Sequence, residues 1–303
     1  ARLTLTLART AAVDRGAAVA NGCALVGLEK DGTGRVTAAV VEADDRRIRV
    51  ACRAVVNAGG VWSDDVRAID EGRHPDSIRP AKGVHITVPW DLVRNEIAAV
   101  LPVPGDKRSV FVVPWGGLTY VGTTDTDYEG PVASPQCTAE DVEYLLRALN
   151  GATGASITAS DVVGTWAGLR PLVKSASSGR TADLSRMHKV RPAESGVVTI
   201  TGGKLTTYRE MAADTVDAVV DDIGEELGRR VGRSRTAKLR LRGADGYAEL
   251  AATDDPTTTH LADRYGGEAR TVLAMVDADP TLGEPLVEGL PYLRAEAVYA
   301  ARH

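Results

Sequence analysis

The sequence predicts a mixed α/β fold, in which two strands of an open sheet are separated by an antiparallel domain and followed by helices. Residues 54–57 and 197–201 are short runs of apolar or β-branched residues, and each leads into two glycines. Small residues at the carboxyl end of a strand are typical of the edge at which an open α/β sheet binds its ligand. The stretch between these runs has the alternation and turn signals of antiparallel strands. After residue 220 the pattern becomes charged and helical.

The composition is that of an ordinary globular protein. The chain has 303 residues, of which 44% are apolar and 25% charged, and this length allows two or three domains. A net charge of −5 argues against nucleic acid as the main partner. The sequence has no apolar run long enough to span a membrane and no signal peptide. Three widely spaced cysteines (Cys23, Cys52 and Cys137) are read as reduced intracellular thiols, with no metal site predicted.

The first 74 residues are predicted to form two helices and several strands. Apolar residues at helical spacing predict a helix over residues 1–15, closed by Gly16. A turn at residues 31–34 joins two strands, and Ser63 is placed to cap a short helix over 64–69. The predicted strands are 17–21, 23–30, 35–42, 46–52 and 54–57, of which 35–42 and 46–52 alternate as half-buried antiparallel strands do.

Antiparallel strands dominate the prediction from residue 75 to residue 195. A helix begins at Thr138, with Glu140 and Asp141 in its first turn, where the helix dipole favours negative charge. A strand ending at Leu169 delivers Arg170. The predicted strands are 78–89, 110–114, 118–122 and 161–169, with a polar loop at 123–127 and a loop or edge strand at 175–191.

Beyond residue 196 the chain is predicted to return to the first sheet and then to become helical. The predicted elements are a strand over 197–201, a helix over 208–220, a basic linker over 229–238, and helices over 247–252, 259–265, 268–276 and 295–302.

The turn between residues 201 and 208 has the chemistry of an anion site. Gly202 and Gly203 carry no Cβ to keep a ligand from the backbone, and they allow positive φ. Thr206 or Thr207 is placed to cap the following helix, whose N–H groups and dipole favour an anion. Lys204 adds a positive charge at the same place. On these residues alone, an ordinary Gly-Gly turn with a solvated lysine is equally consistent with the pattern.

The stretch Gly202-Gly203-Lys204-Leu205-Thr206-Thr207-Tyr208-Arg209 resembles the flavin-contacting motif of the FAD-dependent, quinone-linked glycerol-3-phosphate dehydrogenases. Other stretches follow the order of that family: Val56-Asn57-Ala58-Gly59-Gly60-Val61-Trp62-Ser63, Arg79-Pro80-Ala81-Lys82-Gly83-Val84-His85, Gly122-Thr123-Thr124-Asp125 and Gly168-Leu169-Arg170-Pro171-Leu172. Any one of these matches would be weak, but together and in order they are a strong signal.

The resemblance implies a Rossmann-like FAD-binding domain with an inserted antiparallel substrate domain and a C-terminal helical domain. The expected boundaries are 1–74 and 196–222 for the FAD domain, 75–195 for the substrate domain and 223–303 for the helical domain. No Gly-x-Gly-x-x-Gly follows a predicted strand, although that loop is the phosphate fingerprint of dinucleotide enzymes. Both ends also fall within helical patterns, so we expect a piece of a longer protein that retains FAD poorly.

The reaction implied by the resemblance needs a proton acceptor and fixed positive charge. Histidine has an unperturbed pKa suited to neutral pH, and His85 is the one of five histidines that follows a Lys-Gly turn into a strand. The family motif implies that His85 is the base or orients the substrate hydroxyl. Arg170 matches the active-site arginine, which polarises the substrate oxygen or holds phosphate. Without the family, a packed histidine and a structural ion pair explain both residues.

Further contacts are also carried over from the family motifs. Lys204, Lys82 and Asp125 are expected to bind substrate, the last two with weaker support. The cofactor FAD is expected to contact the Gly-Gly bend at Ala58, Gly59 and Gly60 and the later turn at Gly202, Gly203, Lys204, Leu205, Thr206 and Thr207.

The predicted function is oxidation of glycerol 3-phosphate to dihydroxyacetone phosphate, with electrons passed to a quinone. An oxygen-using glycerol-3-phosphate oxidase, a related D-amino-acid-oxidase-type flavoenzyme and an inactive module that binds a phosphate-bearing ligand remain alternatives. The resemblance implies a cytoplasmic protein with peripheral contact at the plasma membrane, and it leaves a homodimer open.

Overall fold

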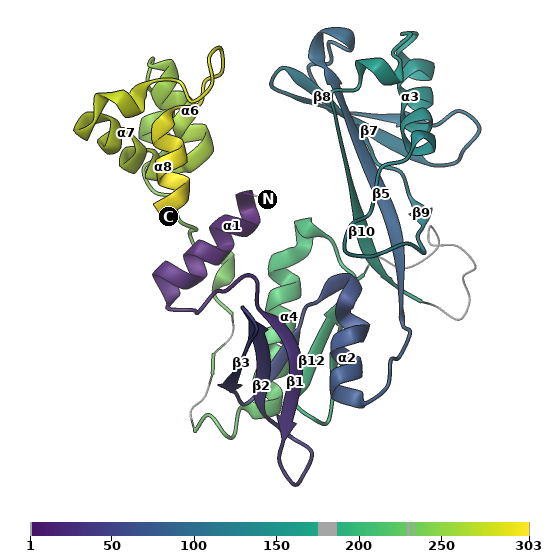
Figure 1. Cartoon of the computed structure of the whole chain (residues 1–303), viewed down its shortest axis with the longest axis vertical. Helices are drawn as coiled ribbons and strands as arrows, with labels where there is room; N and C mark the ends of the chain where they lie inside the picture. The colour runs from purple at the N-terminus through teal and green to yellow at the C-terminus, as the bar shows by residue number, and fades with distance from the viewer. Residues whose placement is uncertain (1, 175–186, 229–230, 233, 303) are drawn as a thin grey trace. The chain divides into compact units, whose positions relative to one another are not determined.

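The computed structural model describes residues 2–174, 187–228, 231–232 and 234–302. The chain forms two compact units, one made of residues 1–22 with 235–303 and the other of residues 23–234 (Figure 1). The predicted first domain, residues 1–74, is therefore divided, because residues 1–22 pack with the C-terminal helices. Among the described residues, no helix combines the length and the hydropathy needed to cross a membrane.

The larger unit begins with a three-stranded antiparallel sheet in the order β1-β2-β3. The predicted turn at residues 31–34 is present, and the Asp31 carboxylate accepts hydrogen bonds from the backbone N–H of Thr33 and Arg35. β3 is exposed along its whole length and not half-buried as predicted. The predicted strand over 17–21 is wrong: these residues are exposed and form no strand. The strands are β1 (Ala24–Lys30), β2 (Val36–Ala43) and β3 (Arg46–Ala51).

A second sheet has the order β11-β12-β4, and its β12 and β4 are parallel. Helices α2 and α4 both pack against β12 (Figure 1). Ser63 is the first residue of α2 and not its cap, and no side chain caps this helix. The elements are β4 (Val55–Asn57), α2 (Ser63–Glu71), β11 (Lys189–Pro192), β12 (Val197–Thr201) and α4 (Tyr208–Ile223).

The third sheet has the order β10-β5-β8-β7-β6, with the short β9 paired to β5. Helix α3 covers one face of it (Figure 1). The helix begins where predicted, and the Thr138 side chain caps it by accepting the N–H of Asp141. Alternate residues of β5, including Val84 and Ile86, are buried with Leu145 and Leu149 of the helix. The elements are β5 (Ile78–Pro89), β6 (Ala99–Pro102), β7 (Ser109–Trp115), β8 (Leu118–Gly122), β9 (Thr126–Asp127), α3 (Ala139–Thr153) and β10 (Gly164–Val173).

The smaller unit is helical, as predicted. Its core contains Leu261, Val272 and Tyr299. The Glu268 carboxylate accepts hydrogen bonds from Arg9, in the first helix, and from Arg242, which is why the N-terminal residues belong to this unit. The helices are α1 (Arg2–Arg9), continued by a π-helical turn (Thr10–Asp14), α5 (Tyr247–Ala251), α6 (Pro256–Tyr265), α7 (Ala269–Ala278) and α8 (Arg294–Arg302).

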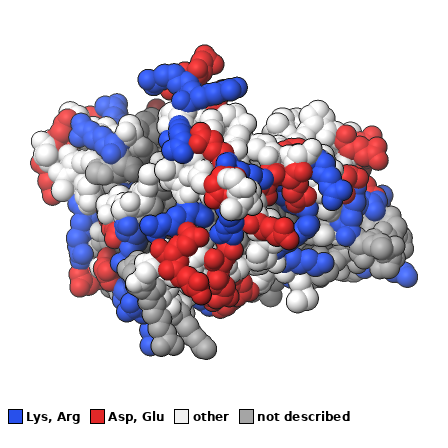
Figure 2. Space-filling view, turned by 90° about the horizontal axis from the view of Figure 1, so that it is seen from below, with Lys and Arg blue, Asp and Glu red and all other residues white. Residues whose placement is uncertain are grey.

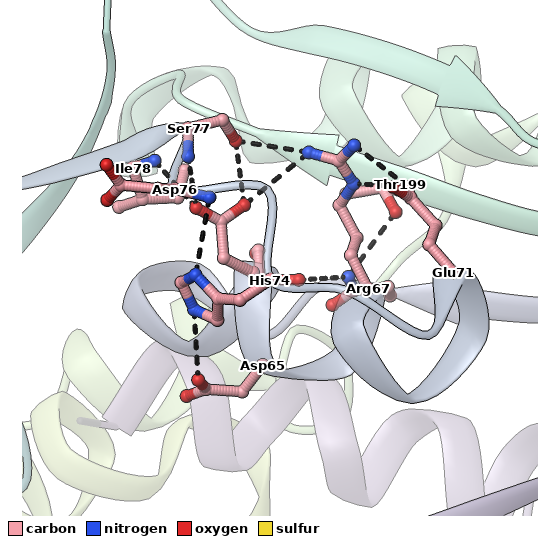
Figure 3. A network of polar contacts seen from close by, with 11 residues as sticks. Asp65, Arg67, Glu71, His74, Asp76, Ser77, Ile78 and Thr199 are labelled. Atoms are coloured by element: carbon pink, nitrogen blue, oxygen red, sulfur yellow. Dashed lines mark hydrogen bonds and ion pairs between the residues drawn. The ribbon is translucent and has the colours of Figure 1, made fainter.

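A polar network joins α2 to the start of β5 (Figure 3). The Asp64 carboxylate accepts hydrogen bonds from the N–H of Ser77 at 2.5 Å and of Ile78 at 2.8 Å. Arg67 pairs with Glu71 at 2.8 Å and donates to the Ser77 hydroxyl at 3.1 Å. These bonds lower the pKa of Asp64 against its burial. The start of β5 is therefore held against α2, the helix that packs on the second sheet.

Charged side chains of both signs are present on the face shown in Figure 2. On this face, lysine and arginine are interspersed with aspartate and glutamate. Ion pairs among the described residues include Arg35 with Asp222 at 2.8 Å and Arg49 with Glu29 at 2.7 Å.

Candidate functional site

The two predicted Gly-Gly bends lie at the same edge of one sheet. Parallel pairing places Thr199 of β12 opposite Asn57 of β4, so the carboxyl ends of both strands lie at the same edge of the sheet. The bend that starts at Ala58 and the turn that starts at Gly202 follow these two ends. In an open α/β sheet this carboxyl edge is where ligands bind.

The first bend is held from within by Asn57, which is buried. Its side-chain oxygen accepts the N–H of Gly59 at 3.1 Å, and its amide donates to the Ser63 carbonyl at 2.9 Å and to the Thr199 hydroxyl at 3.3 Å. Gly60 has φ +59, and the side where its Cβ would stand is open space. The bend therefore presents bare backbone, while Asn57 fixes its position.

The second turn needs its glycines for packing as well as for conformation. Gly202 and Gly203 have φ +72 and +79. A Cβ would stand 2.7 Å from the Met187 carbonyl oxygen at Gly202 and 2.4 Å from the Met211 sulfur at Gly203. Thr207 precedes α4 but makes no side-chain cap; its hydroxyl instead donates to the Lys204 carbonyl at 3.0 Å. Lys204, Leu205 and Thr206 are exposed.

His85 and Arg170 lie on one face of the third sheet. Register pairs His85 with Trp166, Gly83 with Gly168 and Ala81 with Arg170 across β5 and β10. Side chains directly opposite each other point to the same face, and so do residues two apart. This face is the one not covered by α3. The paired glycines Gly83 and Gly168 thus lie between the His85–Trp166 pair and Arg170. Because glycine has no side chain, they leave room above the sheet.

The His85 ring is held between an aromatic ring and a glycine. It stacks on Trp166, with ring centroids 5.0 Å apart and planes 12° from parallel. It also lies over Gly122 of β8, where a Cβ would stand 2.4 Å from the ring. Burial and, to a smaller extent, the charge of Arg170 hold the pKa of His85 below its usual value. The imidazole is therefore neutral at neutral pH and able to accept a proton.

The Arg170 side chain lies over Gly83, where an added Cβ would stand 2.6 Å from the guanidinium. The guanidinium contacts the Asp125 carboxylate at 3.4 Å, the Thr123 hydroxyl at 3.1 Å and the Thr124 carbonyl at 3.3 Å. It also acts electrostatically on the His85 imidazole. These contacts orient the guanidinium before any substrate arrives, and they place positive charge beside the imidazole.

Arg170 and Lys204 line the same cavity. Its volume is about 410 Å³, and it lies between Leu169–Leu172 of β10 and Gly202–Leu205 of the second turn. A second cavity, of about 340 Å³, continues past Lys204 along Met187, His188 and Thr207. The structure thus brings together three predicted residues, because Arg170 is close to the imidazole and shares the cavity with Lys204.

Lys82 is not part of this arrangement. It alternates with Gly83 and His85 along β5, so its side chain points to the face covered by α3, where its Nζ pairs with Asp141 at 2.5 Å and bonds the Gln136 carbonyl at 3.3 Å. The expectation that Lys82 contacts substrate is therefore corrected: it stabilises the start of the helix. Asp125 is in place near the site, but it contacts Arg170, so we assign it to orienting that side chain.

Three side chains that the sequence reasoning did not select belong to the site. Trp166 stacks on His85, the Thr123 hydroxyl bonds Arg170, and Asn57 holds the first bend. Asn57 and Thr123 stand inside the motifs quoted above, so treating every polar residue of those motifs as a candidate would have found them. Trp166 carries no such signal, since its importance arises from the register of two strands.

The residues present fit the part of FAD that carries the ring. Bare backbone at Gly59 and Gly60 lies at the same sheet edge as the turn that lines the 410 Å³ cavity. A flat aromatic ring needs such a surface without side chains, and a lysine beside it suits an electron-rich carbonyl.

Comparison with known proteins agrees with this geometry. Residues 1–209 match the family described as FAD dependent oxidoreductase, and residues 234–303 match the C-terminal domain of alpha-glycerophosphate oxidase. Glycerol-3-phosphate dehydrogenase 2 of Mycobacterium tuberculosis is 40% identical over 99% of this chain and 52% of its own length. A probable mitochondrial glycerol-3-phosphate dehydrogenase of Caenorhabditis elegans is 34% identical over 100% of this chain and 44% of its own length.

A solved structure has the same fold. The glycerol-3-phosphate dehydrogenase of Bacillus halodurans complexed with FAD superimposes with a TM-score of 0.74 and 33% identity, covering 90% of this chain and 55% of that one. The chain spans about half the length of the curated relatives it matches. On the match that extends over residues 1–209, this chain belongs to the family of FAD-dependent oxidoreductases.

Proposed function

We propose that the full-length protein oxidises glycerol 3-phosphate to dihydroxyacetone phosphate with FAD as the hydride acceptor. The observation that carries this proposal is the arrangement of three side chains, those of His85, Arg170 and Lys204. The His85 imidazole and the oriented Arg170 guanidinium lie on the same face of the third sheet, and that guanidinium lines a cavity together with Lys204. The names of the relatives, which are glycerol-3-phosphate dehydrogenases, support the choice of substrate.

Arg170 and Lys204 would hold the phosphorylated substrate. A guanidinium with its fork of donors matches the oxygens of a phosphate or of an adjacent carbonyl, and a lysine adds a mobile charge. Asp125 and Thr123 keep the guanidinium in one orientation, so less side-chain freedom is lost when substrate binds. The exposed Lys204 at the turn is free of such packing and can adjust to the ligand.

His85 would take the proton of the secondary hydroxyl as the substrate becomes a ketone. Burial and Arg170 lower the pKa of this imidazole, so it is unprotonated at neutral pH and ready to act as a base. Stacking on Trp166 fixes the plane of the ring and therefore the direction in which its nitrogens point. FAD, when bound along Gly59–Gly60 and Gly202–Thr207, supplies the hydride acceptor.

The electron acceptor and the location belong to the same proposal. We assign a quinone as acceptor and the cytoplasmic face of the plasma membrane as the place of peripheral contact, on the motif resemblance. The match of residues 234–303 to a domain named after alpha-glycerophosphate oxidase favours oxygen as the second candidate acceptor. Hydrogen peroxide production in air, compared with quinone reduction without air, separates the two.

Replacing Arg170 tests the proposal directly. In the full-length enzyme, Arg170→Ala is expected to lower kcat/KM for glycerol 3-phosphate by about 10²-fold or more, as does loss of one oriented donor in an active site. A dye-reduction assay with glycerol 3-phosphate, glycerol and glycine side by side measures the effect and the substrate class. Kinetics equal to those of the wild type, or a preference for glycine, would refute the proposal.

A further inference from the structure

Arg108 contacts the segment between β8 and β9, which also orients Arg170. Arg108 lies in the hairpin between β6 and β7, and its Nη1 donates to the main-chain carbonyl of Asp125. The carboxylate of the same Asp125 contacts Arg170 at 3.4 Å. Two guanidinium groups thus contact the short segment between β8 and β9: Arg108 bonds its main chain at Asp125, and Arg170 bonds the Thr124 carbonyl and the side chains of Thr123 and Asp125.

Arg108 is itself anchored firmly. Its Nε donates to the Asp106 carboxylate at 2.9 Å, and the hydroxyl of Tyr144 in α3 donates to the same carboxylate at 3.2 Å. The guanidinium also lies over the Tyr144 ring, with its carbon 5.2 Å from the ring centre. Arg108 holds the pKa of Asp106 far below its usual value, so this anchor stays charged across the working pH range.

We propose that Arg108 is a positioning residue for the substrate arginine, a role that rests on the proposed function. Its hydrogen bond sets where the Asp125 main chain lies, and Asp125 in turn sets the direction of Arg170. Arg108 touches neither the cavity lined by Arg170 nor His85, so it acts only through this segment.

Loss of Arg108 should loosen Arg170 more than it loosens the fold. The Arg108 side chain is 37% exposed, and water can replace it around Asp106. The Asp125 carbonyl then loses a charged donor, and the guanidinium of Arg170 samples more orientations. A binding group that is less well oriented weakens substrate affinity before it affects the chemical step.

The test uses the full-length, FAD-loaded enzyme and four variants. Arg108→Ala removes the contact, and Asp106→Asn weakens its anchor while keeping Arg108. Arg147→Ala is the matched control, because the Arg147 guanidinium carbon also lies over the Tyr144 ring, 5.5 Å from its centre. Arg170→Ala is the reference. The readouts are KM and kcat for glycerol 3-phosphate, the Kd of dihydroxyacetone phosphate from perturbation of the flavin absorbance, and Tm.

Arg108→Ala is expected to raise KM and Kd by about fivefold to tenfold, with a smaller change in kcat. The reason is that the variant loses one charged hydrogen bond, which affects substrate binding indirectly, through Asp125 and Arg170. Asp106→Asn should change both in the same direction by about threefold, and Arg147→Ala by less than about twofold. If both hairpin variants keep the wild-type Kd while Arg170→Ala weakens binding, the role of Arg108 is refuted and the proposed function stands. If Arg170→Ala also binds like the wild type, the proposed function fails with it.

Discussion

The two faces of β5 carry different chemistry on adjacent residues. On the face covered by α3, Lys82 is buried and paired with Asp141, among the apolar side chains of Val84 and Ile86. On the open face, Gly83 leaves room for a guanidinium and His85 stacks on an aromatic ring. A single Lys-Gly-x-His motif therefore contributes to the folding of the domain with one residue and to the candidate site with the next.

Charge alone therefore does not identify a site residue. Lys82 and Arg170 are both cations beside carboxylates. The side chain of Lys82 is 10% exposed and that of Arg170 is 28% exposed. Lys82 pairs with Asp141 between the third sheet and α3. Arg170 instead faces a cavity in which a substrate anion can reach it. The following predictions test this contrast, beginning with the face covered by the helix.

Replacing Lys82 should produce the largest effect, a loss of folding stability. Lys82→Met leaves the Asp141 carboxylate buried without its cation, and removing one partner of a buried pair costs about 3–5 kcal/mol. Urea denaturation of the wild type and the variant, followed by circular dichroism, measures the change. Lys174→Met is the control, because Lys174 pairs with Asp76 at the surface, with side chains 43% and 75% exposed, and should cost less than about 1 kcal/mol. Equal losses in both variants would contradict the burial argument.

Gly83→Ala should lower catalytic efficiency by disturbing Arg170 on the open face, without unfolding the sheet. A Cβ at Gly83 would stand 2.6 Å from the Arg170 guanidinium, whereas a Cβ at Gly168, directly opposite in register, meets nothing within 4 Å. Displacing the guanidinium is expected to lower kcat/KM by about tenfold, equivalent to about 1.4 kcal/mol. Steady-state kinetics of the full-length Gly168→Ala enzyme should stay close to those of the wild type. Similar kinetics for the two alanine variants would show that Arg170 can move aside without loss.

Trp166→Ala should produce the smallest change, a shift in pH dependence. Burial keeps the pKa of His85 below its usual value, so the wild type keeps its base unprotonated to a lower pH and loses activity as pH falls through that pKa. Without the stacked ring, water reaches the imidazole and its pKa rises. The acid limb of kcat/KM is therefore expected to move to higher pH. Trp115→Ala, which removes a ring stacked on Tyr120 and not on His85, should leave the limb in place.

The sequence predicted most of the elements because their signals are local. The hairpin of β7 and β8, the strand β12 and the helices of the smaller unit follow from alternation, helical spacing and turn residues close to one another in the chain. The strand expected over 17–21 failed for the opposite reason: a strand needs a neighbour to pair with, and the composition of a segment does not show whether one is present.

The same division applies to the candidate site. The sequence alone determined the residue types and their order: the Gly-Gly bends, His85, Arg170 and Lys204 stand in recognisable motifs. Which of the motif residues contribute to the site depends on the tertiary structure. Strand register placed Trp166 against His85, and alternation along β5 turned Lys82 toward α3. The physical reason is that contacts between distant segments depend on how strands align and which face a helix covers, and neither property belongs to any one stretch of sequence.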